Sequence, residues 1–212
     1  MFVEKFNYND RDDLFANTYV LSDENHRAVI IDPSVDYDGI INYLERNNLT
    51  PVGVLLTHAH YDHLRGVKRL LDKYLIPLYI HSLEMDSLLD PYKNCSLMLG
   101  GSFTLDVKDR IKPINDKEVL KILNNDINVI HTPYHTIGSV CYYCPKEGYL
   151  FSGDTLFRGS VGRNDLPTST SKYMRETFDK LKALPKEVKV YPGHDANTTI
   201  EYELSFNRFL NY

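Results

Sequence analysis

The chain lacks long apolar runs and a leader-like start. None of its apolar stretches approaches the ~20 residues that cross a bilayer. Its first residues, MFVEKFNYND, put no basic segment before an apolar one, so we expect no signal peptide. The net charge of -5 disfavours binding to nucleic acid or to an anionic membrane. We therefore expect a cytoplasmic protein that binds neither.

Cysteine and flexible linkers are also scarce. Three cysteines, an odd number, argue against a disulfide framework. Cys141 and Cys144 lie in an expected strand, where residues three apart face opposite sides, so we interpret them as buried structural thiols and not as a redox or zinc pair. No tandem repeat or linker rich in Gly and Ser occurs. We expect one domain over residues 1–212, in halves of about 1–115 and 116–212.

Strand and helix patterns alternate along the chain. Apolar or alternating runs predict strands at 15–23, 27–32, 52–56, 78–82, 118–123, 127–132, 139–144, 148–154 and 187–193. Helical spacing of apolar residues predicts helices at 36–48, 62–74, 83–90 and 170–184. Residues 91–117 are predicted to be irregular. This mixture indicates an α/β fold in which two sheets pack together with helices outside.

The segment HAHYDH, residues 58–63, contains three histidines and one aspartate. Alternation across Ala59 directs His58 and His60 to the same side of an extended backbone. Asp62 is expected to cap the following helix and, with His63, to point into the same space. Imidazole nitrogens and carboxylate oxygens are ligands of zinc, iron and manganese. Crowded histidines would repel when protonated, so we interpret the segment as part of a metal site and not as polar loop residues.

Three further ligand-type side chains each follow a predicted strand and a turn residue. They are His135 in TPYHTIGS, Asp154 in GDTLF and His194 in PGHD. Each alone is more often a turn or hydrogen-bonding residue. Their combination with residues 58–63 predicts a metal centre assembled from loops at strand ends.

These four motifs resemble, in order, those of the metallo-β-lactamase fold superfamily. They are most similar to its glyoxalase II-like branch of hydroxyacylglutathione hydrolases, and the resemblance runs from about residue 16 to His194. It implies an αββα sandwich: two mixed sheets packed face to face, helices outside, and two metal ions between the two halves. Zinc is expected, with iron or manganese as alternatives.

The resemblance also implies which residue does what. The first metal would be bound by His58, His60 and His135, the second by Asp62, His63 and His194, and both by Asp154. As catalytic residues, Asp62 and Asp154 would position a bridging hydroxide that attacks the substrate. Asp32, Thr57 and Thr132 are candidates for orienting the ligand imidazoles.

Four other residues are considered for roles in substrate binding or in the structure. Arg163 is a candidate for holding a substrate carboxylate, although a structural ion pair is an equal alternative. Tyr134, where the family usually has glycine, is a candidate for lining the substrate pocket. His131 lies within a predicted strand and His81 at the end of another, and we interpret both as structural.

The implied activity is hydrolysis of a small thioester or ester, with a hydroxyacylglutathione first and a lactone second. Only residues 195–212 follow His194, where the mammalian form of glyoxalase II has a helical extension that contacts glutathione. A β-lactamase is disfavoured because that branch lacks the bridging aspartate. A nuclease is disfavoured because the chain has neither the length nor the basic charge. The alternatives are a persulfide dioxygenase with one iron on His58, His135 and Asp154, and a non-catalytic metal-binding protein.

Overall fold

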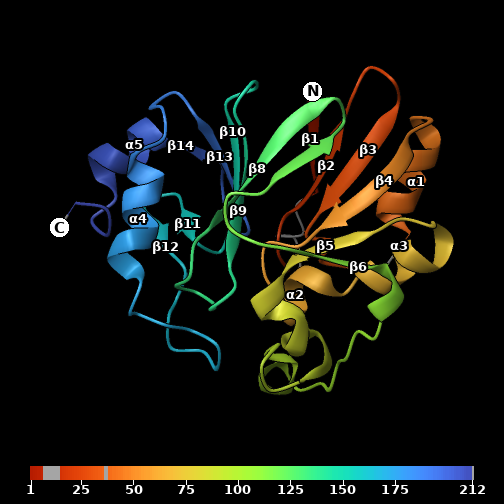
Figure 1. Ribbon diagram of the computed structural model, residues 1–212, viewed down its shortest axis with the longest axis horizontal. Coiled ribbons are helices and arrows are strands. Elements are labelled where there is room, and N and C mark those ends of the chain that lie inside the picture. The colour runs from red at the N-terminus through yellow and green to blue at the C-terminus, as the bar shows by residue number, and fades with distance from the viewer. Residues whose placement is uncertain (7–14, 36–37, 212) are drawn as a thin grey trace.

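The computed structural model describes residues 1–6, 15–35 and 38–211. Two six-stranded sheets face each other at its centre (Figure 1). The first, in the order β1-β2-β3-β4-β5-β6, contains Phe2–Phe6, Thr18–Ser22, Arg27–Ile31, Thr50–Leu55, Leu78–His81 and Ile111–Ile114. The second, in the order β14-β13-β10-β9-β8-β7, contains Thr198–Thr199, Lys189–Pro192, Tyr149–Gly153, Val140–Cys144, Asn125–His131 and Val119–Ile122. The chain passes between the sheets after β6, near residue 115.

Both sheets are mixed. In the first, β1, β2 and β3 pair antiparallel, and β3 to β6 pair parallel. In the second, β10 and β13 are parallel and the other pairs are antiparallel. A separate two-stranded ribbon pairs β11, Leu156–Phe157, with β12, Ser160–Val161.

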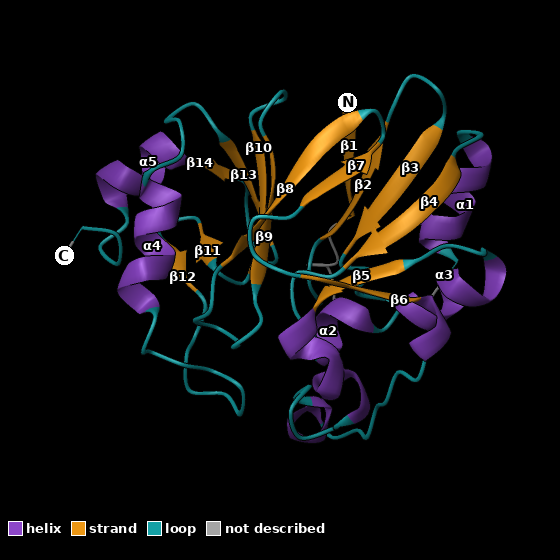
Figure 2. Cartoon of the chain, in the orientation of Figure 1, coloured by secondary structure: helices purple, strands orange, loops and turns teal. Residues whose placement is uncertain are grey.

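Helices cover the outer faces of the sheets (Figure 2). α1, Gly39–Arg46, and α3, Val67–Lys73, cover the first sheet, and α4, Met174–Lys182, and α5, Ile200–Phe206, cover the second. A short helix, α2, spans Tyr61–Leu64, and 3-10 helices span Ser82–Leu89 (η1), Ser96–Leu99 (η2) and Lys108–Arg110 (η3). Among the described residues, no helix has both the length and the apolar character that a membrane span requires.

Alternation along the strands separates three cores. In β2, Val20 packs towards the helices of the first sheet, whereas Tyr19 and Leu21 pack between the two sheets. In β9, Cys141 joins the core under α4 and α5, and Cys144 joins the core between the sheets. The helix–sheet–sheet–helix order confirms the predicted αββα sandwich, and both thiols are free and buried, as the strand pattern predicts.

The predicted helix at 62–74 is instead two helices separated at Gly66. A Cβ at Gly66 would overlap the Val35 carbonyl oxygen, and the Gly66 N–H donates to the Pro33 carbonyl at 2.8 Å. This close approach breaks a helix that the spacing of apolar residues continues. The prediction that Asp62 caps it is also wrong: His60 is at the N-cap, and Asp62 lies in the first turn.

Other predictions differ in detail. The helix predicted at 83–90 is the 3-10 helix η1. The region 91–117, predicted to be irregular, contains η2, η3 and strand β6. The elements β1, β11, β12, β14 and α5 were not predicted. Three of these strands, β11, β12 and β14, have only two residues each, which is too short for a pattern of alternation. The start of the helix predicted at 36–48 lies at residues outside those described.

Candidate metal centre

Four loops bring the predicted ligand residues to one end of the sandwich. The loop after β4 carries residues 58–63, and β8, β10 and β13 are followed by His135, Asp154 and His194. β8 and β10 are both antiparallel to β9, and β13 is parallel to β10, so the last three strands end at the same edge. Strand direction therefore brings His135, Asp154 and His194, which lie up to 59 residues apart in sequence, to one edge of the second sheet.

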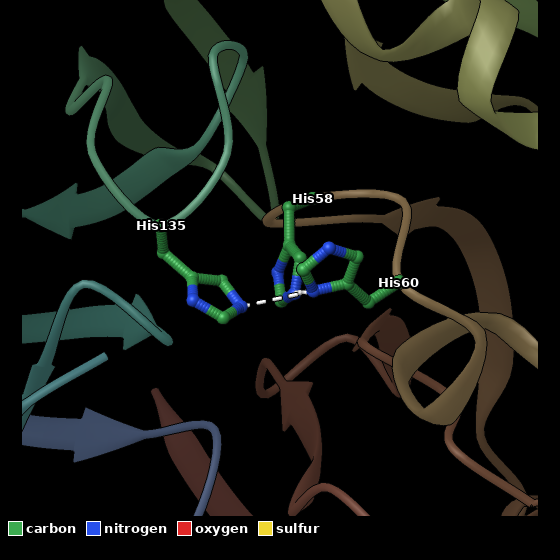
Figure 3. A group of neighbouring side chains, drawn as sticks. All are labelled: His58, His60 and His135. Atoms are coloured by element: carbon green, nitrogen blue, oxygen red, sulfur yellow. Dashed lines mark hydrogen bonds between the residues drawn. The ribbon is translucent and has the colours of Figure 1, made fainter. Parts of the chain in front are cut away.

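His58, His60 and His135 form the first group (Figure 3). The His60 Nδ1 atom lies 3.1 Å from His58 Nε2 and 2.9 Å from His135 Nε2. All three side chains are buried. Burial and the neighbouring His135 lower the pKa of His60 to about 3, and burial and His63 hold the pKa of His58 well below its usual range. The lowered pKa values keep the His58 and His60 rings neutral, and one nitrogen of each of the three rings faces the same point, as a metal ligand set requires.

Asp62, His63 and His194 form the second group. Asp62 Oδ2 lies 3.2 Å from His194 Nε2 and 3.7 Å from His63 Nε2. Asp154 lies between the groups: its Oδ1 is 3.2 Å from His63 Nε2, and its Oδ2 is 3.4 Å from His135 Nε2 and 3.5 Å from His194 Nε2. One carboxylate therefore faces both groups.

The charges of this centre favour a bound cation. Asp62 and Asp154 bring two carboxylates into a site where most of the ligand side chains are buried. The pKa of His63 would be lowered by burial alone. It is instead raised well above its usual range by the carboxylates of Asp154, Asp62 and Asp32. The buried atoms His60 Nε2, His63 Nε2 and Asp154 Oδ1 make no hydrogen bond of good geometry, although the last two lie 3.2 Å apart as an ion pair. Buried polar atoms of this kind are normally hydrogen-bonded or bound to a metal, so the residues present fit divalent ions.

Residues behind the ligands fix the orientation of their rings. His63 Nδ1–H donates to Asp32 Oδ2 at 3.0 Å, and the Thr57 hydroxyl donates to the same oxygen at 2.6 Å. The Thr57 oxygen in turn accepts from His58 Nδ1–H at 3.1 Å. Both hydrogen bonds keep a proton on Nδ1 and direct Nε2 towards the centre, where a metal ion would take the place of any proton on that atom. Asp32 and Thr57 thus lie where a ring-orienting role requires.

The third candidate for this role, Thr132, does not contact a ligand ring. Its hydroxyl pairs with the Thr155 hydroxyl at 2.9 Å. His135 Nδ1–H donates instead to the Arg163 carbonyl at 2.7 Å. A main-chain acceptor leaves no trace in a pattern of side chains, so the sequence gives no signal for this contact.

The loop that carries His194 is fixed by residues near the N-terminus. The Pro192 carbonyl accepts from Asn17 Nδ2 at 2.9 Å and from the Tyr19 hydroxyl at 2.7 Å. A Cβ at Gly193 would overlap Asp154 Oδ1, so the close approach of this loop requires glycine. Neither Asn17 nor Tyr19 was predicted to act at the site.

Of the two residues predicted to bind substrate, one lies at the pocket and the other does not. Arg163 lies at the rim of the pocket above the centre, and its guanidinium pairs with Asp165 through bonds of 2.6 and 2.8 Å, with both side chains exposed. Tyr134 does not line this pocket: its ring is buried 5.1 Å from that of Phe178, in the core under α4. We therefore correct the expectation for Tyr134, which supports the loop from behind.

A family profile described as the metallo-beta-lactamase superfamily matches residues 11–194. The chain belongs to this superfamily. It is 36% identical to a solved structure named BLEG-1 B3 metallo-beta-lactamase, with all of both chains covered and a TM-score of 0.90. It is 31% identical to TTHA1623 in a di-iron-bound form, with 99% of this chain and 100% of that chain covered and a TM-score of 0.83.

A hydroxyacylglutathione hydrolase of Klebsiella pneumoniae is also similar. The two sequences are 34% identical over 177 residues, which cover 84% of this chain and 61% of that enzyme. The predicted glyoxalase II-like resemblance is therefore confirmed. Membership of the metallo-beta-lactamase superfamily and a cluster of histidines and aspartates that could hold metal ions together indicate a metal centre.

Proposed function

We propose that this superfamily member is a dinuclear metal-dependent hydrolase of a small thioester or ester. The observation that carries the proposal is the position of Asp154, whose two oxygens face two separate groups of three ligands. Two divalent ions bound by these groups would activate a water molecule and polarise the substrate carbonyl. Zinc suits the histidine-rich set, and the di-iron form of TTHA1623 supports iron as the alternative.

The chain's own residues would position the reactants. Asp62 and Asp154 line the floor of a pocket of about 510 Å³, where their oxygens would accept hydrogens from the attacking water. Asp32 and Thr57 hold the ligand rings, so that little reorganisation accompanies the reaction. Arg163 at the rim is the candidate for binding a substrate carboxylate, and the Klebsiella relative supports a glutathione thioester as the first substrate to test.

Metal content and hydrolysis, measured together, test the proposal. Protein purified without added metal or chelator should carry close to two divalent ions per chain by plasma mass spectrometry and should hydrolyse an acyl thioester. Asp154→Ala should lower both values, with a loss of rate above about 100-fold, because residues behind metal ligands already account for about 10- to 100-fold. His26→Ala, which removes an exposed histidine in a distant turn, is the control.

Two results would contradict it. Asp154→Ala with full metal content and activity would refute a shared bridging ligand. One iron per chain, together with oxygen uptake on a persulfide, would favour the mononuclear dioxygenase instead.

A second candidate is hydrolysis of a β-lactam amide. The presence of Asp154 disfavours it, but a protein named as a B3 metallo-beta-lactamase is 36% identical over the full chain. A chromogenic cephalosporin assayed beside the thioester and a lactone separates the candidates. The proposed function requires the thioester or another ester to give the highest kcat/KM.

A further inference from the structure

The pocket above the metal centre has an apolar wall. Its lining comprises His60, Asp62, Cys95, Met98, Leu99, His135, Asp154, Phe157, Arg163, Leu166 and His194. Besides the ligand residues, the lining includes four apolar side chains, Met98 and Leu99 of η2 with Phe157 and Leu166, which we name the acyl wall. The Phe157 ring lies 5.9 Å from that of the ligand His194, so the acyl wall begins beside the metal centre.

The turn that supplies Met98 and Leu99 reverses the usual distribution of polar and apolar residues. Asn94 and Ser96 are fully buried, whereas Met98 is 54% exposed and Leu99 is 46% exposed. Exposed apolar side chains that gather at a concave site are typical of ligand binding. The turn therefore holds apolar side chains against the pocket instead of burying them in the core.

Buried polar contacts fix this turn relative to the ligands. The Asn94 side chain accepts from the Ser96 N–H at 3.0 Å and donates to the Phe103 carbonyl at 2.9 Å. The Asn94 carbonyl accepts from the N–H of Tyr61 at 2.8 Å, and Tyr61 directly precedes the ligand Asp62. The acyl wall therefore has a defined position above the metal centre.

Charge in the pocket disfavours an anionic group on the acyl chain itself, whereas a carboxylate elsewhere in the substrate would have to displace the exposed Asp165 from Arg163 at the rim. Among the described residues that line the pocket, Arg163 is the one that carries a permanent positive charge, and its guanidinium is paired with Asp165. An anion there would have to compete with Asp165 for the guanidinium. An uncharged alkyl chain would only displace water from Met98, Leu99, Phe157 and Leu166, which is favourable.

We propose that the acyl wall binds the acyl chain of the substrate, and that the preferred substrates are thioesters or esters of aliphatic acids longer than acetate. This inference rests on the proposed function and adds the substrate class. Each methylene buried against the wall contributes about 0.8 kcal/mol, which equals about a fourfold rise in kcat/KM, until the wall is covered.

A homologous series of acyl thioesters tests the inference. The acetyl, butanoyl, hexanoyl and octanoyl thioesters of N-acetylcysteamine share one uncharged thiol and differ only in the acyl chain. kcat/KM should rise with chain length. Met98→Ser and Leu99→Ser should each lower the octanoyl-to-acetyl ratio about tenfold, because each removes apolar area from the wall.

Leu97→Ser is the matched control. Leu97 belongs to the same turn and is 54% exposed, but it does not line the pocket, so the ratio should stay unchanged. A flat series in the parent protein would overturn the inference, even where hydrolysis itself is observed. The inference is also overturned if Leu97→Ser lowers the octanoyl-to-acetyl ratio as much as Leu99→Ser does. The effect would then come from disturbance of the turn and not from lost contact with the acyl chain.

A binding measurement separates failure of this inference from failure of the proposed function. Calorimetry with the S-alkyl thioethers of N-acetylcysteamine, which cannot be hydrolysed, should show affinity that rises from ethyl to octyl and falls in Leu99→Ser. If no thioester or ester is hydrolysed but this trend appears, the proposed function fails and the acyl wall stands. If affinity does not depend on chain length, the acyl wall is refuted.

Discussion

A buried glutamate joins the two loops that carry the first ligand group. Glu84, on η1, is 1% exposed. Its Oε2 accepts from the Ala59 N–H and its Oε1 from the Gly138 N–H, both at 2.9 Å. Ala59 lies between two ligand histidines, and Gly138 ends the turn that follows His135. The side chain is therefore a clamp between the two sheets at the metal centre.

Glu84→Gln replaces one accepting oxygen by an NH₂ group. One of the two buried N–H groups then loses its partner, at a cost of about 1–3 kcal/mol in the free energy of unfolding. Glu84→Ala leaves both unpaired, for about 2–6 kcal/mol. Because a domain is typically stable by about 5–15 kcal/mol, the glutamine variant should still fold. Loosening of the loops should also weaken metal binding by at least about tenfold.

Urea unfolding and a competition assay with a metal chelator measure the two effects. Glu203→Gln is the matched control, because Glu203 is also fully buried and accepts from the Gly159 N–H at 2.9 Å and the Thr198 hydroxyl at 2.6 Å. It should lose stability to a similar extent and keep its metal affinity. A Glu84→Gln protein within about 0.5 kcal/mol of the parent, with unchanged metal affinity, would refute the clamp.

Two further outcomes follow from the contacts of single residues. Gly193→Ala should shift the loop away from Asp154 and reduce the metal content to about one ion per chain. Gly101→Ala, at an open position, is the control and should keep two ions. Mass spectrometry of the purified proteins measures the metal content of both. His81 lies 4.2 Å from His131 in a ring stack, and burial and this neighbour lower its pKa to about 4. Between about pH 4 and 6.5 the unfolded chain therefore binds more protons at this histidine than the folded chain does. The free energy of unfolding should fall by about 1–3 kcal/mol as the pH drops through this window. His81→Phe should reduce this dependence of the free energy of unfolding on pH, measured by urea unfolding.

The ligand residues can be predicted from the sequence because the ends of the strands that precede them can be predicted. Apolar runs locate the ends of β4, β8, β10 and β13, and the directions of these strands bring their ends together. A single polar side chain of ligand type after such a run is more often a turn residue, but four of these positions converging on one place indicate a metal site. The assignment of individual residues to the first or the second group came from the family resemblance, because spacing alone does not distinguish them.

Contacts made by the main chain are not predictable in this way. The Arg163 carbonyl that orients His135, and the Ala59 N–H that binds Glu84, depend on loop conformation and not on residue type. Tyr134 shows the same limit. It directly precedes a ligand, yet adjacent loop residues point in different directions, and its ring packs in the core behind the loop.

Three of the eight described non-glycine residues with a positive φ lie beside the metal centre or its pocket. Asp32, Cys95 and Asp195 have left-handed backbones, with φ of 48°, 64° and 64°, which non-glycine residues adopt at a cost. Asp32 binds a ligand ring, Asp195 follows the ligand His194, and Cys95 begins the turn of the acyl wall. The other five, such as Asn48 after α1, lie outside these segments. Non-glycine residues in a left-handed conformation on three separate segments next to the ligands are what a site selected for function is expected to contain, because function is where local preference is most often overridden.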